Sequence, residues 1–487
     1  MSFSAPTSRA QRSRRILPWL LYLYALVLFA MHFVRIFDNS FWGDEGFTIR
    51  LAKMDFVDMV IATAKDVHPP LYYFFTQILC RIFGFHGFTY HLSAVIPYGI
   101  LLVLCCTVIR KWFGLIPAAI VVTLSSLTDA AITYNVEARM YSLAALFVLV
   151  AYLAFYQIYQ KNRLMDWFLF GFSSLCAAYT HYYALISVAF FYLMLLPLLW
   201  RGKEYRKRII WLYGGTVFSY IFWLYVLLKT FKRTNGSWWM TSIATFSECF
   251  DFVWGYKWLA VLAFALFFTA TVLILKQFFR SHTLPDESIL FLAGSFSIFG
   301  TILVGIAVSY LSSPLIIPRY LFPLAPVAYL MLSRIIQRLP YQNLIACSLI
   351  VILLVSGVPT YWAIHRHEQE IERGTQICTE LFASSEDPIL YTNDVGWNFE
   401  FNAENLFPSI PYVDNDEALS SLTDTHKDIW VLWSRPLSSE ETAQILNSGF
   451  SIQEVFSGYA FHDLFTGKFM SDPVYTIFHL YKLEAHP

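Results

Sequence analysis

The feature that most constrains this chain is a series of apolar stretches, each long enough to cross a lipid bilayer. Crossing about 30 Å of hydrocarbon takes roughly 20 apolar residues. Stretches of about that length lie at 16–36, 90–109, 113–133, 140–159, 166–181, 182–200, 209–230, 252–275, 287–311, 319–337 and 342–362. Composition agrees: 57% of the 487 residues are from the set AVILMFWYC and 14% are charged, against about 25% charged in soluble proteins. A soluble enzyme is excluded, and we predict an α-helical polytopic membrane protein with about eleven spans.

Basic residues in the connections orient these spans. They cluster at 110–111, 161–163, 201–208, 276–280 and 334–338. All these clusters fall on the same side as the N-terminus, which the positive-inside bias assigns to the cytoplasm. The arginines at 9–15 precede the first span, and no small-residue cleavage site follows it, so we expect a retained signal anchor. If the apolar stretch 68–84 were also a span, the basic clusters that follow it would fall on the opposite side of the membrane. We therefore expect it to lie at the membrane surface, in an outer loop at 37–89 with two interfacial helices.

The C-terminal part differs in composition from the rest. Polar residues become frequent after Trp362, and short β-like runs begin at 388, 427, 451 and 474. The segment from Ser438 to Phe450 has the signals of a capped helix with a glycine stop. We therefore predict a membrane module at 1–363 and a small extracytoplasmic α/β domain at 364–487. Net charge is balanced, with 34 Lys and Arg against 34 Asp and Glu, so nothing indicates a nucleic-acid partner.

The outer connections carry acids, imidazoles, arginines and tyrosines close to the span ends. They are Asp44, Glu45, Asp66, His68, Glu137, Arg139, Tyr141, His181, Tyr182, Arg319 and Tyr320. Alone, each has an ordinary explanation, such as a solvated helix cap or an interface anchor. Together they are more informative, because charged groups at a membrane are costly and tend to mark function. Trp238 and Trp239 lie in another outer loop, where they would stack on a sugar or anchor the interface.

The motifs FWGDEGFT, HPPLYY, EARMYSL, THYY and PRYLFPLAP follow one another in this order. Their order resembles that of the C-type (GT-C) membrane glycosyltransferases, in the branch of the protein O-mannosyltransferases and the lipid A aminoarabinose transferase. The resemblance covers roughly residues 16–340. It implies a polyprenyl-phosphate sugar donor, an acidic pair of the first outer loop in the active site, basic residues on the phosphate, and two juxtamembrane helices. The aminoarabinose branch has Lys where this chain has His68, and the motifs name no counterpart for the C-terminal domain.

The chemistry of such a transfer assigns roles to these residues. A phosphate leaves the anomeric carbon through an oxocarbenium-like transition state, so cations must stabilise it; His68, Arg139 and Arg319 are the candidates. The acceptor hydroxyl needs a general base, for which we predict Asp44, with Glu45 beside it. Asp66, Glu137 and the aromatic residues named above are expected to contact substrate. No cofactor is required by this scheme; a divalent metal ion, held by Glu45 and a histidine, is an open alternative.

The expected partners are the bilayer, a polyprenyl-phosphate sugar and a saccharide, lipid or protein acceptor. The protein is expected in the cell membrane, with its site and C-terminal domain outside the cytoplasm. A different class remains as an alternative, namely a transporter or flippase of lipid-linked saccharides. Transporters place polar sites near the bilayer midplane, whereas the candidate residues here fall at span ends. That difference favours the enzyme.

Overall fold

The computed structural model describes residues 8–37, 41, 43–66, 68–233, 242–312, 314–391, 409–413, 428–433, 437–457 and 479–485. The chain divides into two compact units. The first consists of Met1–Ile36 and Ala52–Pro359, and the second of Phe37–Leu51 and Thr360–Pro487.

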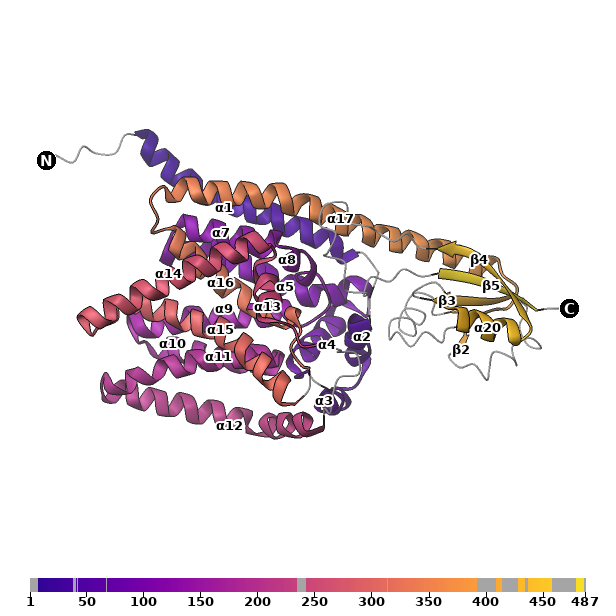
Figure 1. The fold of residues 1–487 in the computed structure, drawn as a ribbon, viewed down its shortest axis with the longest axis horizontal. Helices are drawn as coiled ribbons and strands as arrows, with labels where there is room; N and C mark the ends of the chain where they lie inside the picture. Colours follow the sequence, from indigo (N-terminus) through magenta and orange to yellow (C-terminus); the bar gives the residue numbers. More distant parts are fainter. Residues whose placement is uncertain are drawn as a thin grey trace. The chain divides into compact units, whose positions relative to one another are not determined.

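The first unit is built from helices (Figure 1). Two stretches of the helical elements given next, residues 43–51 and 360–384, belong to the second unit. In chain order, the helical elements are α1 (Ser8–Val34), η1 (Arg35–Phe37), α2 (Gly43–Lys53), α3 (Phe56–Lys65), α4 (Leu71–Phe83), α5 (Gly87–Leu104), η2 (Cys105–Ile109), α6 (Arg110–Phe113), α7 (Leu115–Leu127), α8 (Asp129–Tyr134), α9 (Tyr141–Lys161), α10 (Leu164–Thr180), α11 (Tyr182–Leu195), η3 (Leu196–Trp200), α12 (Lys203–Arg233), α13 (Phe246–Trp254), α14 (Lys257–Ser281), α15 (Asp286–Leu311), η4 (Pro318–Leu324), α16 (Ala325–Ile336) and α17 (Gln342–Ser384).

Within the described residues, eight helical segments are long and apolar enough to span a membrane. They are Leu17–Phe37, Gly87–Phe113, Tyr141–Lys161, Tyr182–Trp200, Lys203–Lys229, Lys257–Ser281, Asp286–Leu311 and Gln342–Arg366. The predicted polytopic helical fold is therefore confirmed, whereas the count of eleven is not. The other three predicted spans contain helices that are shorter: α7 with α8, α10, and α16 preceded by η4. Thr128 shows one cause, since its extended backbone (φ −74°, ψ 149°) separates α7 from α8.

The connection between α1 and α5 contains three helices, α2, α3 and α4, where two were expected. The additional break falls at Asp55, which precedes α3 with an extended backbone (φ −66°, ψ 154°). Helix α4 has 13 residues and is therefore about 20 Å long. That is too short for the hydrocarbon core, in agreement with the expectation that this segment does not span.

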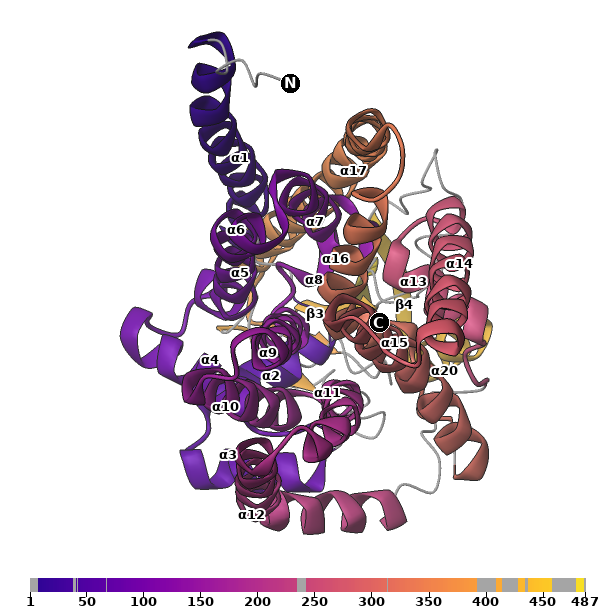
Figure 2. The same ribbon diagram turned by 90° about the vertical axis from the view of Figure 1, so that its left-hand side faces the viewer.

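Helix α9 lies at the centre of the first unit. It packs against α5, α10, α11, α15, α16 and η4 (Figures 1 and 2), and 83% of its most apolar stretch is buried. Its sequence is apolar on all faces, which is typical of a helix surrounded by others. By contrast, α12 and α14 are each 22% buried over the same length. They are therefore the helices that present most of their surface to lipid.

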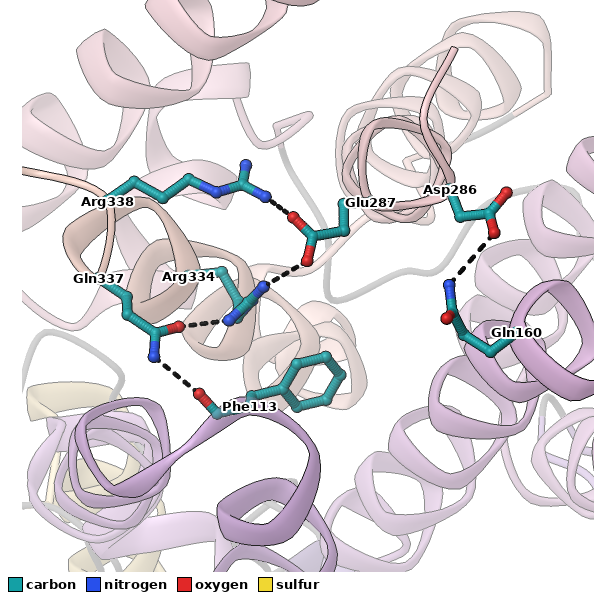
Figure 3. Close-up of polar contacts among 7 residues, drawn as sticks. All are labelled: Phe113, Gln160, Asp286, Glu287, Arg334, Gln337 and Arg338. Atoms are coloured by element: carbon teal, nitrogen blue, oxygen red, sulfur yellow. Dashed lines mark hydrogen bonds and ion pairs between the residues drawn. The ribbon is translucent and has the colours of Figure 1, made fainter. Parts of the chain in front are cut away.

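A group of polar side chains fastens one end of the bundle (Figure 3). Glu287, in the first turn of α15, pairs with Arg334 Nη2 at 2.9 Å and also with Arg338. Gln337 accepts a hydrogen bond from Arg334 and donates one to the carbonyl oxygen of Phe113 at 2.8 Å. An acid in a first helical turn and cations in a last turn complement the helix dipoles. These residues lie at the end that the charge pattern predicts to be cytoplasmic.

The second unit contains a mixed sheet with strand order β2-β1-β3-β5-β4. Its strands are β1 (Pro388–Tyr391), β2 (Tyr412–Val413), β3 (Asp428–Trp433), β4 (Phe450–Ser457) and β5 (His479–Ala485). β1 pairs in parallel with β2 and β3, whereas β5 pairs antiparallel with β3 and β4. The predicted small α/β fold is confirmed.

One helix of this unit, α20 (Ser439–Asn447), packs against β4. Ser438 and Glu441 form a capping box at its start, and Gly449 follows its end with φ +91°. Both ends therefore use the signals that the sequence displays. On the sheet, Trp430 packs against Phe382 of α17 with ring centroids 5.6 Å apart.

Candidate functional site

His68 lies in the short connection between α3 and α4. Asp66 ends α3, and the prolines at 69 and 70 stop any continuation of that helix while allowing α4 to begin at Leu71. This connection turns the His68 ring into the protein, where it is 9% exposed. His68 Nδ1 lies 3.0 Å from Asp66 Oδ2. The carboxylate therefore fixes the orientation of the imidazole.

Arg139 lies in residues 135–140, between α8 and α9, and is 2% exposed. Buried non-helical backbone requires hydrogen-bond partners from the protein. Asn135 Nδ2 donates a hydrogen bond to the carbonyl oxygen of Ser125 at 2.8 Å. Nδ1 of His91 lies 3.0 Å from the carbonyl oxygen of Val136. These bonds from neighbouring helices hold the segment that carries the guanidinium.

Arg139 also contacts the α3–α4 connection. Its Nη2 lies 3.4 Å from His68 Nε2, and its Nη1 lies 3.4 Å from the Tyr73 hydroxyl. A guanidinium only donates hydrogen bonds, so His68 Nε2 is the acceptor. The ring proton of His68 is then on Nδ1, from which it donates to Asp66. Histidine, arginine and carboxylate form one hydrogen-bonded chain.

His181 lies between α10 and α11 and adds a second imidazole. Its Nδ1 accepts a hydrogen bond from the backbone N–H of Tyr183 at 3.2 Å, so Nε2 carries the proton of the neutral ring. The ring centroid lies 6.2 Å from that of His68, 5.1 Å from that of Tyr320 and 5.9 Å from that of Tyr141. Residues from α9, α11 and η4 thus meet the α3–α4 connection.

Burial and nearby charged groups change the pKa of His181. Burial is the main cause that lowers the pKa of His181 well below 6.5, and repulsion from any proton on His68 and from the charges of Arg139 and Arg319 lowers it further. Arg319 lies in η4, directly before Tyr320. His181 is therefore neutral near neutral pH, and the basic residues concentrate positive potential around it.

The structure thus brings together His68, Arg139, His181, Tyr141 and Tyr320, with Arg319 near enough to act on His181. We call these six residues the cationic cluster. Asp66 joins it through His68, and Glu137 is buried in the same segment as Arg139. The Tyr182 hydroxyl lies 3.3 Å from Trp223 Nε1.

The remaining predicted residues are elsewhere. Asp44 and Glu45 lie in the first turn of α2, in the second unit, and their relation to the cationic cluster stays a prediction. Trp238 and Trp239 lie outside the described residues. Sequence reasoning missed the contact of Tyr73 with Arg139; the signal was the second tyrosine of HPPLYY. Within the described ranges, no three His, Cys, Asp or Glu side chains are arranged to hold a metal ion.

The helical bundle that holds the cationic cluster is that of a multi-pass membrane protein, and comparison with solved structures identifies it as the GT-C fold. Residues 67–225 match the family model of dolichyl-phosphate-mannose-protein mannosyltransferase. ArnT from Cupriavidus metallidurans, solved in the apo state, is 13% identical with a TM-score of 0.54, and the comparison covers 95% of this chain and 97% of that chain. The structure of the same protein bound to undecaprenyl phosphate gives the same values. No curated protein matches the sequence.

The resemblance to the C-type membrane glycosyltransferases is confirmed by the matched segment and by the fold. His68, Arg139 and His181 lie within the matched segment, whereas Asp44 and Arg319 lie outside it. The comparisons therefore show the GT-C fold for this chain and a match to the mannosyltransferase family model over residues 67–225.

Proposed function

We propose that this protein transfers a sugar from a polyprenyl-phosphate-linked donor to an acceptor hydroxyl on the outer face of the cell membrane. The acceptor is a glycan, lipid or protein of the cell envelope. In this proposal residues 1–363 carry the reaction, and residues 364–487 form an extracytoplasmic domain.

The observation that carries the proposal is the cationic cluster. Arg139 and His68 are buried, and Arg319 is partly buried, in one region of a membrane protein, where charged groups are costly and tend to mark function. A phosphate fits this charge and geometry, because a guanidinium binds two phosphate oxygens through parallel hydrogen bonds. We assign the donor phosphate to Arg139, Arg319 and His68. ArnT, which has the same fold, was solved with undecaprenyl phosphate, and that supports a polyprenyl phosphate as the carrier.

The departing phosphate gains charge as its bond to the anomeric carbon breaks. Preorganised cations stabilise that charge more strongly in the transition state than in the bound donor, which accelerates the reaction. The acceptor hydroxyl must lose its proton, and we assign Asp44 as the general base with Glu45 beside it. A single displacement of this kind inverts the anomeric carbon.

The neighbouring side chains supply substrate contacts in this scheme. His181, neutral because its pKa is lowered by burial and nearby charge, donates from Nε2 to a sugar or phosphate oxygen. Tyr141 and Tyr320, whose rings flank His181, present apolar faces to the sugar. We assign further contacts to Asp66, Glu137, Tyr182, Trp238 and Trp239.

The test is transfer by the purified protein in nanodiscs, with radiolabelled polyprenyl-phosphate sugars as donors and a membrane-lipid extract as acceptor. We expect label to move from one donor to an acceptor in the wild type and not in Asp44→Asn. Absence of transfer with every donor, together with movement of lipid-linked sugar across vesicles that is unaffected by Asp44→Asn, would contradict the enzyme and support the transporter.

A further inference from the structure

The hydrogen bonds of His68 assign an additional role to this residue. One ring nitrogen faces the Asp66 carboxylate at 3.0 Å, and the other faces Arg139 at 3.4 Å. The first contact holds the Nδ1 proton, and the second requires an unprotonated Nε2. The ring is therefore neutral in this arrangement, with its basic nitrogen directed at the guanidinium that we assign to the donor phosphate.

We propose that the Asp66–His68 pair is the proton carrier of the leaving phosphate: His68 takes up a proton at Nε2 when phosphate binds beside Arg139, and donates it to that phosphate as it departs. This rests on the proposed function and extends it from charge stabilisation to acid catalysis. Asp66 is a positioning residue, since it orients the ring and stabilises its protonated form, as a carboxylate does behind a catalytic histidine.

Protons and charges balance in this step. The bond from the anomeric carbon to the phosphate oxygen breaks, and the bond to the acceptor oxygen forms. The acceptor proton goes to the general base, while the Nε2 proton of His68 goes to the departing phosphate oxygen. The donor phosphodiester carries one negative charge, and the product leaves as a singly protonated monoester, also with one negative charge. His68 then regains a proton from solvent, and the base releases one.

The groups around the two histidines favour His68 over His181 as the proton carrier. Tyr73 reaches Arg139 from α4, Tyr320 faces the His68 ring from η4 with centroids 6.3 Å apart, and His181 approaches from the α10–α11 turn. His181 is 2% exposed, and its Nδ1 accepts a hydrogen bond from the Tyr183 backbone, whereas Nδ1 of His68 faces the Asp66 carboxylate. A proton on His68 Nε2 would face the Arg139 guanidinium, whose Nη2 lies 3.4 Å away. In the proposal, proton uptake therefore follows the binding of a phosphate between the two groups.

The experiment measures undecaprenyl phosphate binding to the full-length protein in nanodiscs from about pH 5.5 to 8, together with the protons taken up per binding event, followed with a pH indicator in weak buffer. His68→Lys keeps a cation at all these pH values, whereas His68→Gln is always neutral. The phosphate itself titrates near pH 6, and His68→Lys reports that contribution alone. Asp58→Asn, an exposed acid of α3, and His86→Gln, an exposed histidine, are matched controls.

We expect the wild type to take up more protons than His68→Lys, with a difference approaching one proton near pH 7.5. The affinity of the wild type for undecaprenyl phosphate, divided by that of His68→Lys, should fall as pH rises, by up to about tenfold per pH unit. Asp66→Asn should move that fall to lower pH, and the controls should behave as wild type. Equal proton uptake in wild type and His68→Lys would overturn the proton-carrier role. A wild type that does not bind undecaprenyl phosphate at all would instead overturn the proposed function.

Discussion

Replacement of Arg139 is the most direct perturbation of the proposed phosphate site. The side chain is 2% exposed, so a phosphate beside it would bind with little competition from water. A hydrogen bond to a charged group contributes about 1.5–3 kcal/mol, and a guanidinium offers two in parallel. Taking the lower value for each gives about 3 kcal/mol, which is about 10²-fold in affinity at about 1.4 kcal/mol per tenfold.

We therefore expect Arg139→Ala to weaken undecaprenyl phosphate binding by about 10²-fold. Arg139→Lys keeps the charge and loses the planar fork, so we expect a loss of about tenfold. Binding is measured in nanodiscs beside thermal unfolding, which separates lost binding from lost fold. Arg338→Ala is the control, because this arginine pairs with Glu287 at the end of the bundle shown in Figure 3. An Arg139→Ala protein that unfolds at the wild-type temperature and binds within threefold of wild type would refute the reasoning.

Three further perturbations test separate features. Asp44→Asn should retain undecaprenyl phosphate binding and lose about 10²–10⁴-fold in transfer rate; normal turnover would remove Asp44 as the base. Gly255→Ala should destabilise the fold by about 2 kcal/mol, because φ is +73° and the added Cβ would lie 2.9 Å from Thr128 Cβ; thermal unfolding measures this, with Gly214→Ala, in open space, as control. His181 has a pKa well below 6.5 when folded, so the unfolded chain binds more protons and stability should fall as pH drops below about 6.5. His181→Gln should lessen that fall, and an unchanged pH profile of the unfolding temperature would contradict the assignment.

Much of the architecture follows from local sequence patterns. An apolar stretch of about 20 residues has few alternatives to a membrane helix, and α9 and α15 lie where such stretches were found. Capping signals at Ser438 and Gly449 are equally local, and α20 has the expected ends. Where helices break, the sequence is less informative: neither Thr128 nor Asp55 is a strong breaker, and both adopt extended backbone.

The candidate site could likewise be predicted only in part. Its residue types could be selected from the sequence, because charged groups at span ends are few and costly. Their contacts could not be predicted, since His68 and Arg139 are separated by 70 intervening residues and meet only through the packing of α4, α5 and α9. The contact of Tyr73 with Arg139 is a consequence of the same packing.

The sequence by itself therefore determined the membrane class, most spans, the C-terminal α/β fold and the set of candidate residues, because hydrophobic length and residue charge act locally. Tertiary structure decided which nitrogen of His68 carries a proton and why His181 is neutral. Both depend on burial and on charges brought within a few ångströms from distant helices, where electrostatic interactions are strong because water is excluded.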